Sequence, residues 1–344
     1  ILKKLGIEKL NTMQEKAKSA IELNNEVMLL SPTGTGKTLA FVLPLIPSIK
    51  LDLQEVQIII VVPSRELAIQ IEQVIRDMGA GIKVNAVYGG RSVKKDLIEL
   101  DHSPHILIGT PGRVADHFRR ETISTDHINT LVLDEFDKSL EVGFDKEMSE
   151  ICYALKKVRR KILTSATEGV NVPKFVEFKK PAVIDFLGQK KDKLEINLAL
   201  TNDKDKLQGL LSLLKHLGDE PGIIFCNFKD AIQRISDFLN ENHINHGLFF
   251  GGIEQKDRER ALIKFRNGTN RLMIATDLAA RGLDIPEISY IIQYHLPFSI
   301  EEFIHRNGRT ARMHSEGTSY ILNYEKESLP GYLSKEKYKT IYTR

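Results

Sequence analysis

The sequence predicts an α/β fold with two tandem domains, each a parallel β-sheet flanked by helices. Short runs of β-branched and aliphatic residues alternate with longer amphipathic segments, the pattern of βαβ units around a buried parallel sheet. The alternation occurs twice along 344 residues, a length that fits about two domains. We expect an N-terminal domain over residues 1–187, a linker over 188–197 and a C-terminal domain over 198–344.

Ten apolar runs are the expected strands. Those of the first half are Val27 to Leu30, Ile58 to Val62, Ile106 to Ile108, Leu131 to Leu133 and Ile162 to Thr164. Those of the second half are Gly222 to Cys226, Gly247 to Phe250, Leu272 to Ala275, Tyr290 to Gln293 and Thr318 to Leu322. The segment from Gly188 to Lys193 is polar and without apolar periodicity, which indicates the linker.

The composition excludes several classes of protein. Hydrophobic residues make up 42% and charged residues 28% of the chain, which excludes a disordered protein. Its 49 Lys and Arg against 46 Asp and Glu give a net charge of +3, too even to indicate nucleic-acid binding by itself. Cys152 and Cys226 form no CxxC pair, so neither a disulfide framework nor a zinc site is expected. The longest apolar stretch, Leu39 to Pro47, is far shorter than the roughly 20 residues of a membrane span, so we expect a cytoplasmic protein without membrane contact.

A glycine-rich segment follows the first expected strand and opens a helix from about Leu39. It consists of Ser31, Pro32, Thr33, Gly34, Thr35, Gly36, Lys37 and Thr38. Its glycines allow backbone N–H groups to point at phosphate oxygens, Lys37 can reach the β- and γ-phosphates, and Thr38 can ligate Mg²⁺. The strict pattern has Gly where this chain has Ser31. The segment predicts a nucleotide-binding loop.

Acidic and hydroxyl residues follow two further strands of the first half. Asp134 and Glu135 come directly after Leu133, where carboxylates can hold Mg²⁺ and orient an attacking water. Ser165 and Thr167 follow the strand that ends at Thr164, and their hydroxyls can relay changes between the nucleotide site and the other domain. Taken alone, each group would be an ordinary loop or turn. Their position beyond strand ends, where ligands of open α/β sheets bind, favours the functional interpretation.

Other motifs suit the phosphate backbone of a nucleic acid. Pro63 to Leu67, Gly89-Gly90 and Thr110 to Arg113 combine small residues, helix starts and arginines, which can hold phosphates without reading bases. In the second half, arginines at positions 306, 309 and 312 recur every third residue and so share much of one helix face. Such a face can complete charge stabilisation at a phosphate site when the domains close.

With these motifs in this order, the chain resembles the DEAD-box family of ATP-dependent RNA helicases over nearly its whole length. The resemblance implies two RecA-like domains with the nucleotide site in the cleft between them. It implies that the domains close over ATP and single-stranded RNA and separate short duplexes locally. ATP and Mg²⁺ are the expected cofactors.

The resemblance also implies roles for individual residues. Gln14 would read adenine, Asp284 would meet the ribose, and the catalytic set would be Lys37, Asp134, Glu135, Arg309 and Arg312, the last two as arginine fingers. Coupling of hydrolysis to strand separation would involve Asp137, Ser165, Thr167, His305 and Arg306. RNA would contact Arg65, Gly90, Thr110, Gly112, Arg113, Asn227, Gln255, Arg258, Thr276, Arg281 and Gly282.

The chain departs from the family pattern at further motif positions, of which two are aromatic residues. The signature loop reads Asp-Glu-Phe-Asp, with Phe136 where the family has Ala. Because the carboxylates remain, we expect altered packing with retained chemistry, and we expect Phe136→Ala to be tolerated. Phe228 stands where a small hydroxyl residue is common.

Three functions are compatible with these residues. The leading one is an RNA-stimulated ATPase that unwinds or remodels RNA, acting as a monomer with protein partners in an RNA decay or ribosome-assembly complex. The second is a related DNA helicase. Gln14 and the Asp-Glu-Phe-Asp loop favour RNA over DNA, and competition by an RNA strand would distinguish the two helicases. The third is an ATP-gated RNA clamp or scaffold within a decay or ribosome-assembly complex, which binds RNA when loaded with ATP and shows negligible duplex turnover.

Overall fold

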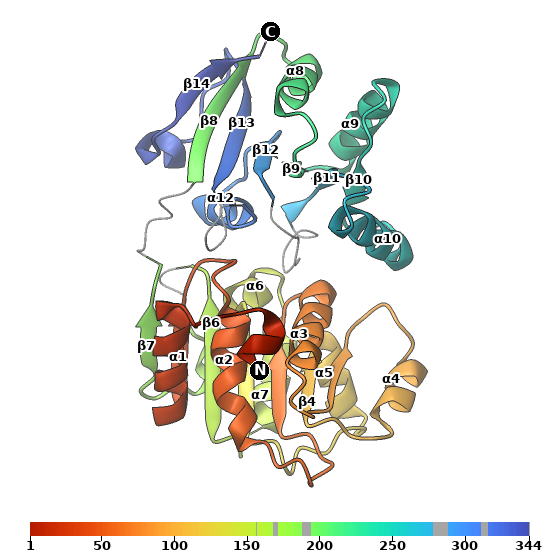
Figure 1. Ribbon diagram of the computed structural model, residues 1–344. Helices are drawn as coiled ribbons and strands as arrows, with labels where there is room; N and C mark the ends of the chain where they lie inside the picture. Colours follow the sequence, from red (N-terminus) through yellow and green to blue (C-terminus); the bar gives the residue numbers. More distant parts are fainter. Residues whose placement is uncertain (156, 168–170, 188–193, 278–287, 311–315, 344) are drawn as a thin grey trace. The chain divides into compact units, whose positions relative to one another are not determined.

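The computed structural model describes residues 1–155, 157–167, 171–187, 194–277, 288–310 and 316–343. The chain divides into two compact units. The described residues of the first unit end at 187, and those of the second begin at 194. Each unit contains one parallel sheet with helices on both faces (Figure 1). None of the described helices is long and apolar enough to cross a membrane.

The first unit alternates strands and helices from its beginning to its end. Its strands are β1 (Glu26–Leu30), β2 (Ile58–Val61), β3 (Val84–Val87), β4 (Ile106–Gly109), β5 (Thr130–Leu133), β6 (Arg160–Ser165) and β7 (Ala182–Asp185). Its α-helices are α1 (Thr12–Leu23), α2 (Lys37–Leu45), α3 (Arg65–Asp77), α4 (Val93–Leu100), α5 (Pro111–Arg119), α6 (Phe136–Glu141) and α7 (Asp145–Ala154), and its 3₁₀ turns are Leu2–Leu5, Ile46–Ser48 and Lys174–Val176.

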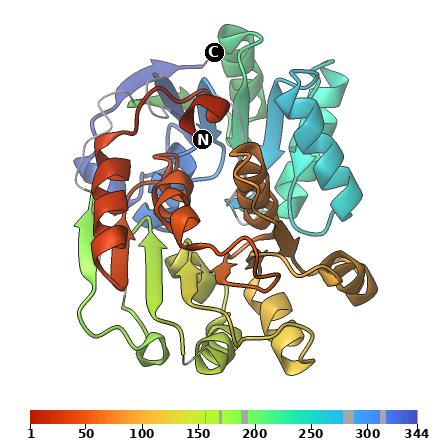
Figure 2. The same ribbon diagram turned by 60° about the horizontal axis from the view of Figure 1, so that its bottom comes forward.

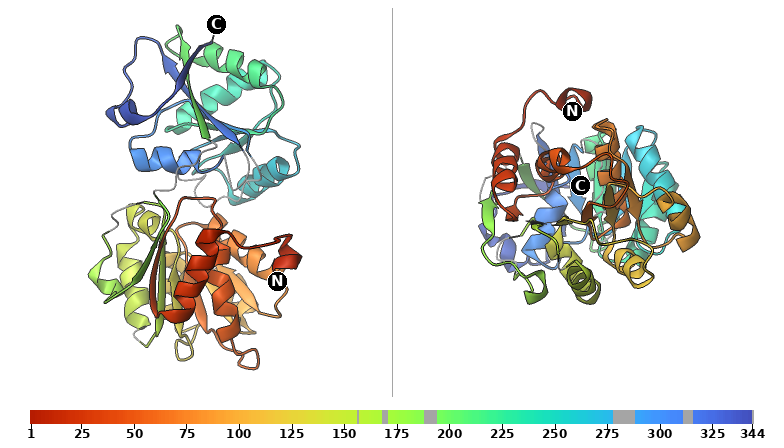
Figure 3. Two further views of the ribbon diagram at one scale, coloured as in Figure 1. Left: turned by 60° about the vertical axis from the view of Figure 1, so that its left-hand side comes forward. Right: turned by 90° about the horizontal axis from the view of Figure 1, so that it is seen from below.

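The strands of this sheet run parallel in the order β3-β4-β2-β5-β6-β1-β7. Alternate residues of a strand point to opposite faces, and β2 is buried on both. Ile58 and Ile60 join one apolar core with residues of α1, α2 and α3, while Ile59 and Val61 join a second core with residues of α5, α6 and α7. The two helix groups therefore cover opposite faces of the sheet, as the turned views show (Figures 2 and 3).

The second unit repeats this architecture. Its strands are β8 (Leu194–Thr201), β9 (Gly222–Phe225), β10 (Gly247–Phe249), β11 (Leu272–Ala275), β12 (Tyr290–Gln293), β13 (Gly317–Tyr324) and β14 (Lys339–Tyr342). Its helices are α8 (Leu207–Leu217), α9 (Lys229–Glu241), α10 (Gln255–Arg266), α12 (Ile300–Asn307) and the 3₁₀ turn Gly331–Lys335. The strands are parallel in the order β10-β11-β9-β12-β13-β8-β14. Helices α8 and α9 pack on one face, and α12 packs on the other.

The fold class predicted from the sequence is confirmed, and each of the ten expected runs is a strand. The structure adds β3, β7, β8 and β14, which the apolar pattern did not predict. Strands β7 and β14 lie at sheet edges and expose part of their side chains, so their sequences are mixed. Residues 194–197, expected in the linker, belong instead to β8, because they pair with β13 from Leu194 onward. The rest of the expected linker core, 188–193, lies outside the described residues.

Candidate active site

The carboxyl ends of the first sheet's strands carry the motifs, and the strand order sorts them into two groups. The phosphate loop follows β1, the acidic loop follows β5 and the Ser165 loop follows β6, and these three strands are neighbours. The loops with Arg65, Gly90 and Thr110 follow β2, β3 and β4, which are also neighbours. The same edge of the sheet thus carries the loops expected to bind the nucleotide next to the loops expected to bind the phosphate backbone of a nucleic acid.

The phosphate loop is a closed turn held by its own side chains. Gly34 and Gly36 adopt φ values of 81° and 82°, in the left-handed region that favours glycine. The Thr35 hydroxyl donates to the Pro32 carbonyl at 2.8 Å. The Lys37 ammonium donates to the carbonyls of Ser31 at 2.6 Å and Pro32 at 3.1 Å. A bound phosphate would therefore replace these main-chain carbonyls as the partner of the buried Lys37 ammonium.

Gln14 ties helix α1 to the phosphate loop. Its Oε1 accepts from the Asn11 N–H at 3.0 Å, and its own N–H donates to Asn11 Oδ1 at 2.9 Å, which is a capping box. Its Nε2 donates to the Gly36 carbonyl at 3.3 Å, and a Cβ on Gly36 would lie only 2.4 Å from that nitrogen. The Asn11 amide adds a bond to the Thr35 carbonyl at 3.1 Å. Adenine reading by Gln14 stays a prediction, whereas the structure gives it a loop-holding role that the sequence did not indicate.

The acidic loop is built around Asp134. The Glu135 N–H donates to Asp134 Oδ1 and to the Thr164 hydroxyl oxygen, both at 3.1 Å, and the Thr164 hydroxyl donates to Asp134 Oδ1. Burial and the adjacent Glu135 charge raise the pKa of Asp134 to about 6, although the Thr164 hydrogen bond and the Lys37 charge oppose the shift. The electrostatics of this loop therefore favour a proton or a cation at Asp134.

Phe136 is only 1% exposed and lies in the core beneath the acidic loop. It packs with residues of β5, α7 and β6, so the ring supports the fold. Removing a buried aromatic side chain leaves a cavity in a close-packed interior. We therefore expect Phe136→Ala to cost stability, and the expectation that its chemistry is retained stays a prediction.

Asp137 and the Ser165 loop form one hydrogen-bonded unit. The Asp137 carboxylate accepts from the Thr167 hydroxyl at 2.8 Å and from the Ala166 N–H at 3.4 Å. The Ser165 hydroxyl accepts from the Thr167 N–H at 3.0 Å. Asp137 Oδ1 is buried and has no hydrogen-bond partner among the described residues. The structure thus brings together three of the residues expected to couple hydrolysis to strand separation.

The loops after β2, β3 and β4 also converge. A Cβ on Gly90 would lie 2.3 Å from Arg65 Nη1, so the Arg65 guanidinium packs directly on this glycine. Thr110 is the N-cap of α5. The Arg113 guanidinium donates to the Tyr88 carbonyl at 3.2 Å and to the Arg91 carbonyl. Arg113, expected to contact RNA, is therefore engaged mainly with the protein.

Arg306 is the centre of the corresponding region of the second unit. The side chain is 1% exposed, and it forms a bidentate pair with Asp277. It also donates to Gln293 Oε1 at 2.8 Å, to the His295 carbonyl at 2.6 Å and to Asn227 Oδ1 at 2.7 Å. These contacts join the carboxyl ends of β9, β11 and β12. The sequence predicted a coupling role for Arg306 and missed this organising role within its own unit.

His295 and Asn227 complete the same network. Burial, with the charges of Lys206, Arg306 and Arg234, lowers the pKa of His295 to about 4. The neutral ring can then accept a hydrogen bond from the Asn227 N–H at 3.3 Å, and the Asn227 amide donates to the Leu296 carbonyl at 2.9 Å. Asn227, expected to contact RNA, has both ends of its amide held inside the unit.

Comparison with known proteins identifies the chain. Residues 11–175 match the family described as DEAD/DEAH box helicase, and residues 205–314 match the helicase conserved C-terminal domain. The ATP-dependent RNA helicase FAL1 of Mycosarcoma maydis is 34% identical over 322 residues, which cover 91% of this chain and 81% of that protein. The chain belongs to the DEAD-box family of ATP-dependent RNA helicases.

Solved structures of DEAD-box proteins have the same fold. S. cerevisiae Dbp5 bound to RNA and ADP BeF3 has a TM-score of 0.86 at 25% identity, covering 99% of this chain and 92% of that one. The DEAD-box helicase Mss116 bound to ssRNA and UDP-BeF has a TM-score of 0.86 at 25% identity, covering 100% of this chain and 77% of that one. Both neighbours therefore agree with tandem RecA-like domains in this DEAD-box protein.

Several residues that the DEAD-box resemblance singled out are not placed by the structure. Asp284, Arg281, Gly282 and Arg312 lie outside the described residues, as does the side chain of Gln255. Of the others, Arg258 stacks over the Phe249 ring at 4.9 Å, Thr276 follows β11, and His305 and Arg309 are buried.

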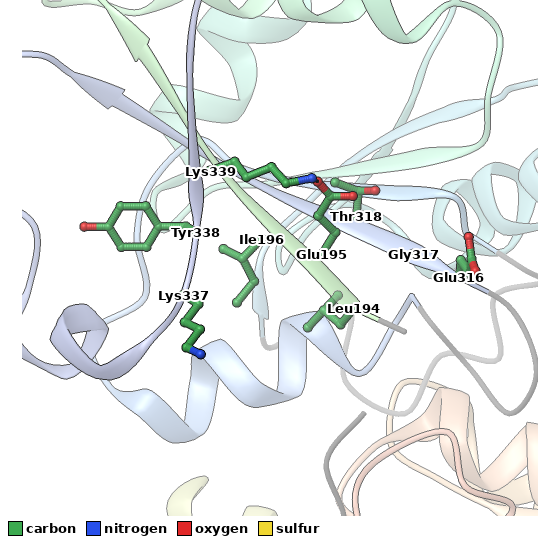
Figure 4. A pocket seen from close by; sticks show the side chains of 9 residues that line it. All are labelled: Leu194, Glu195, Ile196, Glu316, Gly317, Thr318, Lys337, Tyr338 and Lys339. Atoms are coloured by element: carbon green, nitrogen blue, oxygen red, sulfur yellow. The ribbon is translucent and has the colours of Figure 1, made fainter. Parts of the chain in front are cut away.

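A hollow of about 520 Å³ lies elsewhere in the second unit (Figure 4). It opens near the starts of β8, β13 and β14, whereas Asn227 and Asp277 follow the ends of β9 and β11. An exposed ion pair between Lys339 and Glu195, 2.8 Å long, lies on it. The hollow therefore does not coincide with the motifs of this DEAD-box protein.

Proposed function

We propose that this DEAD-box helicase hydrolyses ATP in response to bound RNA and uses the cycle to separate or remodel short RNA duplexes locally. The observation that supports this proposal most is the arrangement of the loops along the carboxyl edge of the first sheet. Phosphate and acidic loops follow β1 and β5, and the backbone-gripping loops follow β2, β3 and β4. Since one rigid sheet carries both groups, RNA binding at one can bias chemistry at the other. Dbp5 and Mss116 were each solved with RNA and a nucleotide analogue, which supports the pairing of ligands.

We infer that ATP binds together with Mg²⁺ at Thr38, Asp134 and Glu135. The hydrogen bonds that Asp134 accepts from described residues all fall on Oδ1, which leaves Oδ2 for a cation or its water. The raised pKa of the buried carboxyl supports a cation there. Among the described residues, no three His, Cys, Asp or Glu side chains form a metal site by themselves. This fits Mg²⁺, which is usually held by one or two carboxylates, waters and substrate phosphates.

The residues of the first unit then have separate tasks. Lys37 binds the phosphate oxygens, Glu135 orients the attacking water, and Thr164 fixes the Asp134 carboxylate. Mg²⁺, when bound, neutralises charge on the transferred phosphoryl group. Asp137, Ser165 and Thr167 respond to the change as one hydrogen-bonded unit. Arg309 and Arg312 supply positive charge from the second unit, and Asp284 and Gln14 hold the nucleoside.

The RNA contacts in this proposal are independent of base sequence. Arg65, Gly90, Thr110 and Gly112 offer a guanidinium and main-chain N–H groups, which suit phosphates and sugars. The second unit adds the loops after β9 and β11. We further propose that the protein acts as a monomer in the cytoplasm with partners in RNA decay or ribosome assembly.

The steady-state ATPase rate with and without single-stranded RNA, beside unwinding of a short RNA duplex, tests the proposal. We expect RNA to raise the turnover number and duplex strands to separate only with ATP. An ATPase rate unaffected by RNA would contradict the proposal. RNA binding that depends on ATP but never turns over a duplex would indicate a clamp, and equal stimulation by a DNA strand of the same sequence would indicate a DNA helicase.

A further inference from the structure

A buried carboxylate, Asp96, lies between the loops that follow β3 and β4. It belongs to α4 and is fully buried. Its Oδ1 accepts from Arg91 Nε at 2.5 Å, and its Oδ2 lies 3.0 Å from Arg113 Nε and 3.2 Å from His117 Nε2. Neither the sequence motifs nor the proposed mechanism uses this residue.

Arg91 and Arg113, which bind Asp96, also donate hydrogen bonds to main-chain carbonyls at the end of β3 and in the loop after it. Arg91 donates to the Ala86 carbonyl at 3.0 Å, at the end of β3. Arg113 donates to the carbonyls of Tyr88 and Arg91, which flank the pair Gly89-Gly90 on both sides. The loop after β3 is thus held at both ends by guanidinium groups that share one carboxylate.

The same carboxylate also fixes the loop after β4. Arg113 lies in the first turn of α5, directly after Thr110, and its side chain is 10% exposed. Holding this guanidinium inward sets the start of α5, whose first N–H groups can bind a phosphate. In the loop after β3, Gly90 has a φ of 91°, and its backbone lies beside Arg65, which follows β2.

A buried charge network of this kind is costly to desolvate and contributes little net stability. Arg91 also pairs with Glu99 at 2.7 Å. The effect of the network lies in fixing one geometry, because a partly satisfied buried network is strongly disfavoured. The two carboxylate oxygens of Asp96 contact three side chains, those of Arg91, Arg113 and His117. These contacts restrict the movement of the loops after β3 and β4.

We propose that Asp96 is a positioning residue for RNA binding. Through Arg91 and Arg113 it holds the loops after β3 and β4 in the shape that grips a phosphate backbone. In this arrangement Arg113 shapes the site, while Arg65 and main-chain N–H groups contact the RNA. The inference rests on the proposed RNA function and adds a residue that touches neither RNA nor ATP.

The test compares Asp96→Asn with the matched control Asp116→Asn. Asp116 lies on α5, and its carboxylate pairs with the exposed Arg120 at 2.9 Å while staying 3.9 Å from Arg113. Both variants remove one negative charge from the same region, but only the first removes the buried acceptor. Hydrogen exchange of the RNA-free full chain is measured over residues 31–38, 88–91 and 110–113. The RNA concentration that gives half-maximal ATPase, the KM for ATP and the turnover number at saturating RNA are measured in parallel.

We expect Asp96→Asn to speed exchange in both loops and to raise the half-maximal RNA concentration about tenfold, the loss typical of one hydrogen bond to a charged group. Exchange over 31–38, the KM for ATP and the turnover number at saturating RNA stay within about twofold, as all values do in Asp116→Asn. If Asp96→Asn unfolds, Arg91→Gln combined with Asp96→Asn removes one charge of each sign, Arg91→Gln alone controls for the lost pair with the half-exposed Glu99, and the same readouts apply.

Unchanged exchange in both loops would overturn the positioning role, and so would faster exchange with unchanged RNA affinity. A parallel loss of ATP and RNA binding would also overturn it, because that result indicates general destabilisation. If the parent chain itself bound no RNA, the proposed function would fail, while the exchange data would still report whether Asp96 holds the loops.

Discussion

The Thr164 hydroxyl donates a hydrogen bond to the carboxylate of Asp134 across the neighbouring strands β6 and β5. This bond lowers the pKa of a carboxyl that burial and Glu135 raise to about 6. Thr164 thereby holds Asp134 in its charged form at neutral pH. The strand end that carries Thr164 also leads directly into Ser165, so the acidic loop and the coupling loop share one support.

Replacement of Thr164 by Val should move the acid limb of the pH profile. Without the hydrogen bond the pKa of Asp134 rises further, so kcat/KM for ATP should begin to fall at a pH about one unit higher than in the parent. Measuring kcat/KM between pH 5 and 8 checks this. Thr164→Ser keeps the hydroxyl and should leave the limb in place; an unmoved limb in the Val variant would refute the role.

Replacement of Asp134 by Asn should remove activity and raise stability. Because the folded pKa of about 6 exceeds the ordinary 3.8, the folded protein binds the proton more tightly, and stability falls as pH rises from about 4 to 6. Above that window the charged carboxyl costs on the order of 3 kcal/mol. Asp134→Asn should therefore raise the free energy of unfolding by about that amount at pH 7.5 and hardly at all at pH 4.

Urea unfolding without nucleotide or Mg²⁺ at both pH values measures this difference. Glu195→Gln, at an exposed carboxylate, is the control variant. A variant less stable than the parent at pH 7.5 would show that the charged Asp134 contributes favourably even without a cation.

Phe136→Ala, which restores the residue typical of the family, should destabilise the first unit. The ring is buried in the core with residues of α7 and β6, and loss of such a side chain costs about 3–5 kcal/mol. ATPase activity per folded molecule should be retained, because Asp134 and Glu135 remain. Urea unfolding and the ATPase rate at low temperature separate the two effects, and an unchanged unfolding midpoint would argue against the packing role.

The sequence predicted the fold well, and it placed the motifs correctly after strand ends, because both depend on local patterns. Runs such as Ile58 to Val62 are apolar throughout, which identifies strands buried on both faces, and the phosphate loop has a fixed spacing. The partners of these motifs depend on tertiary contacts. Thr164, Asp96 and Asp277 contact residues far away in the chain, and no spacing indicates which carboxylate meets which arginine.

Arg306→Lys should destabilise the second unit although the charge is kept. The guanidinium binds Asp277 with two nitrogens and also reaches Gln293, His295 and Asn227. An ammonium cannot span these partners, and buried polar groups left unsatisfied cost about 1–3 kcal/mol each. The unfolding free energy should drop by at least that amount. Glu195→Gln, which breaks the exposed pair with Lys339, should change it by less than about 1 kcal/mol; equal effects of the two variants would contradict the organising role of Arg306.

Arg309→Ala should reduce catalysis. Arg309 follows α12 one turn beyond Arg306, and as an arginine finger it would meet the phosphate charge that develops during hydrolysis. Such a contact stabilises the transition state more than bound ATP, and arginine fingers of GTPases are worth about 10³ to 10⁵ in rate. The turnover number with saturating RNA should therefore fall severely, while the affinity for ATP without RNA changes only slightly. Steady-state ATPase with saturating RNA, ATP titration without RNA and urea unfolding measure the three quantities. A turnover number near that of the parent would reject the finger assignment, and a drop in unfolding free energy as large as that of Arg306→Lys would assign Arg309 to the fold.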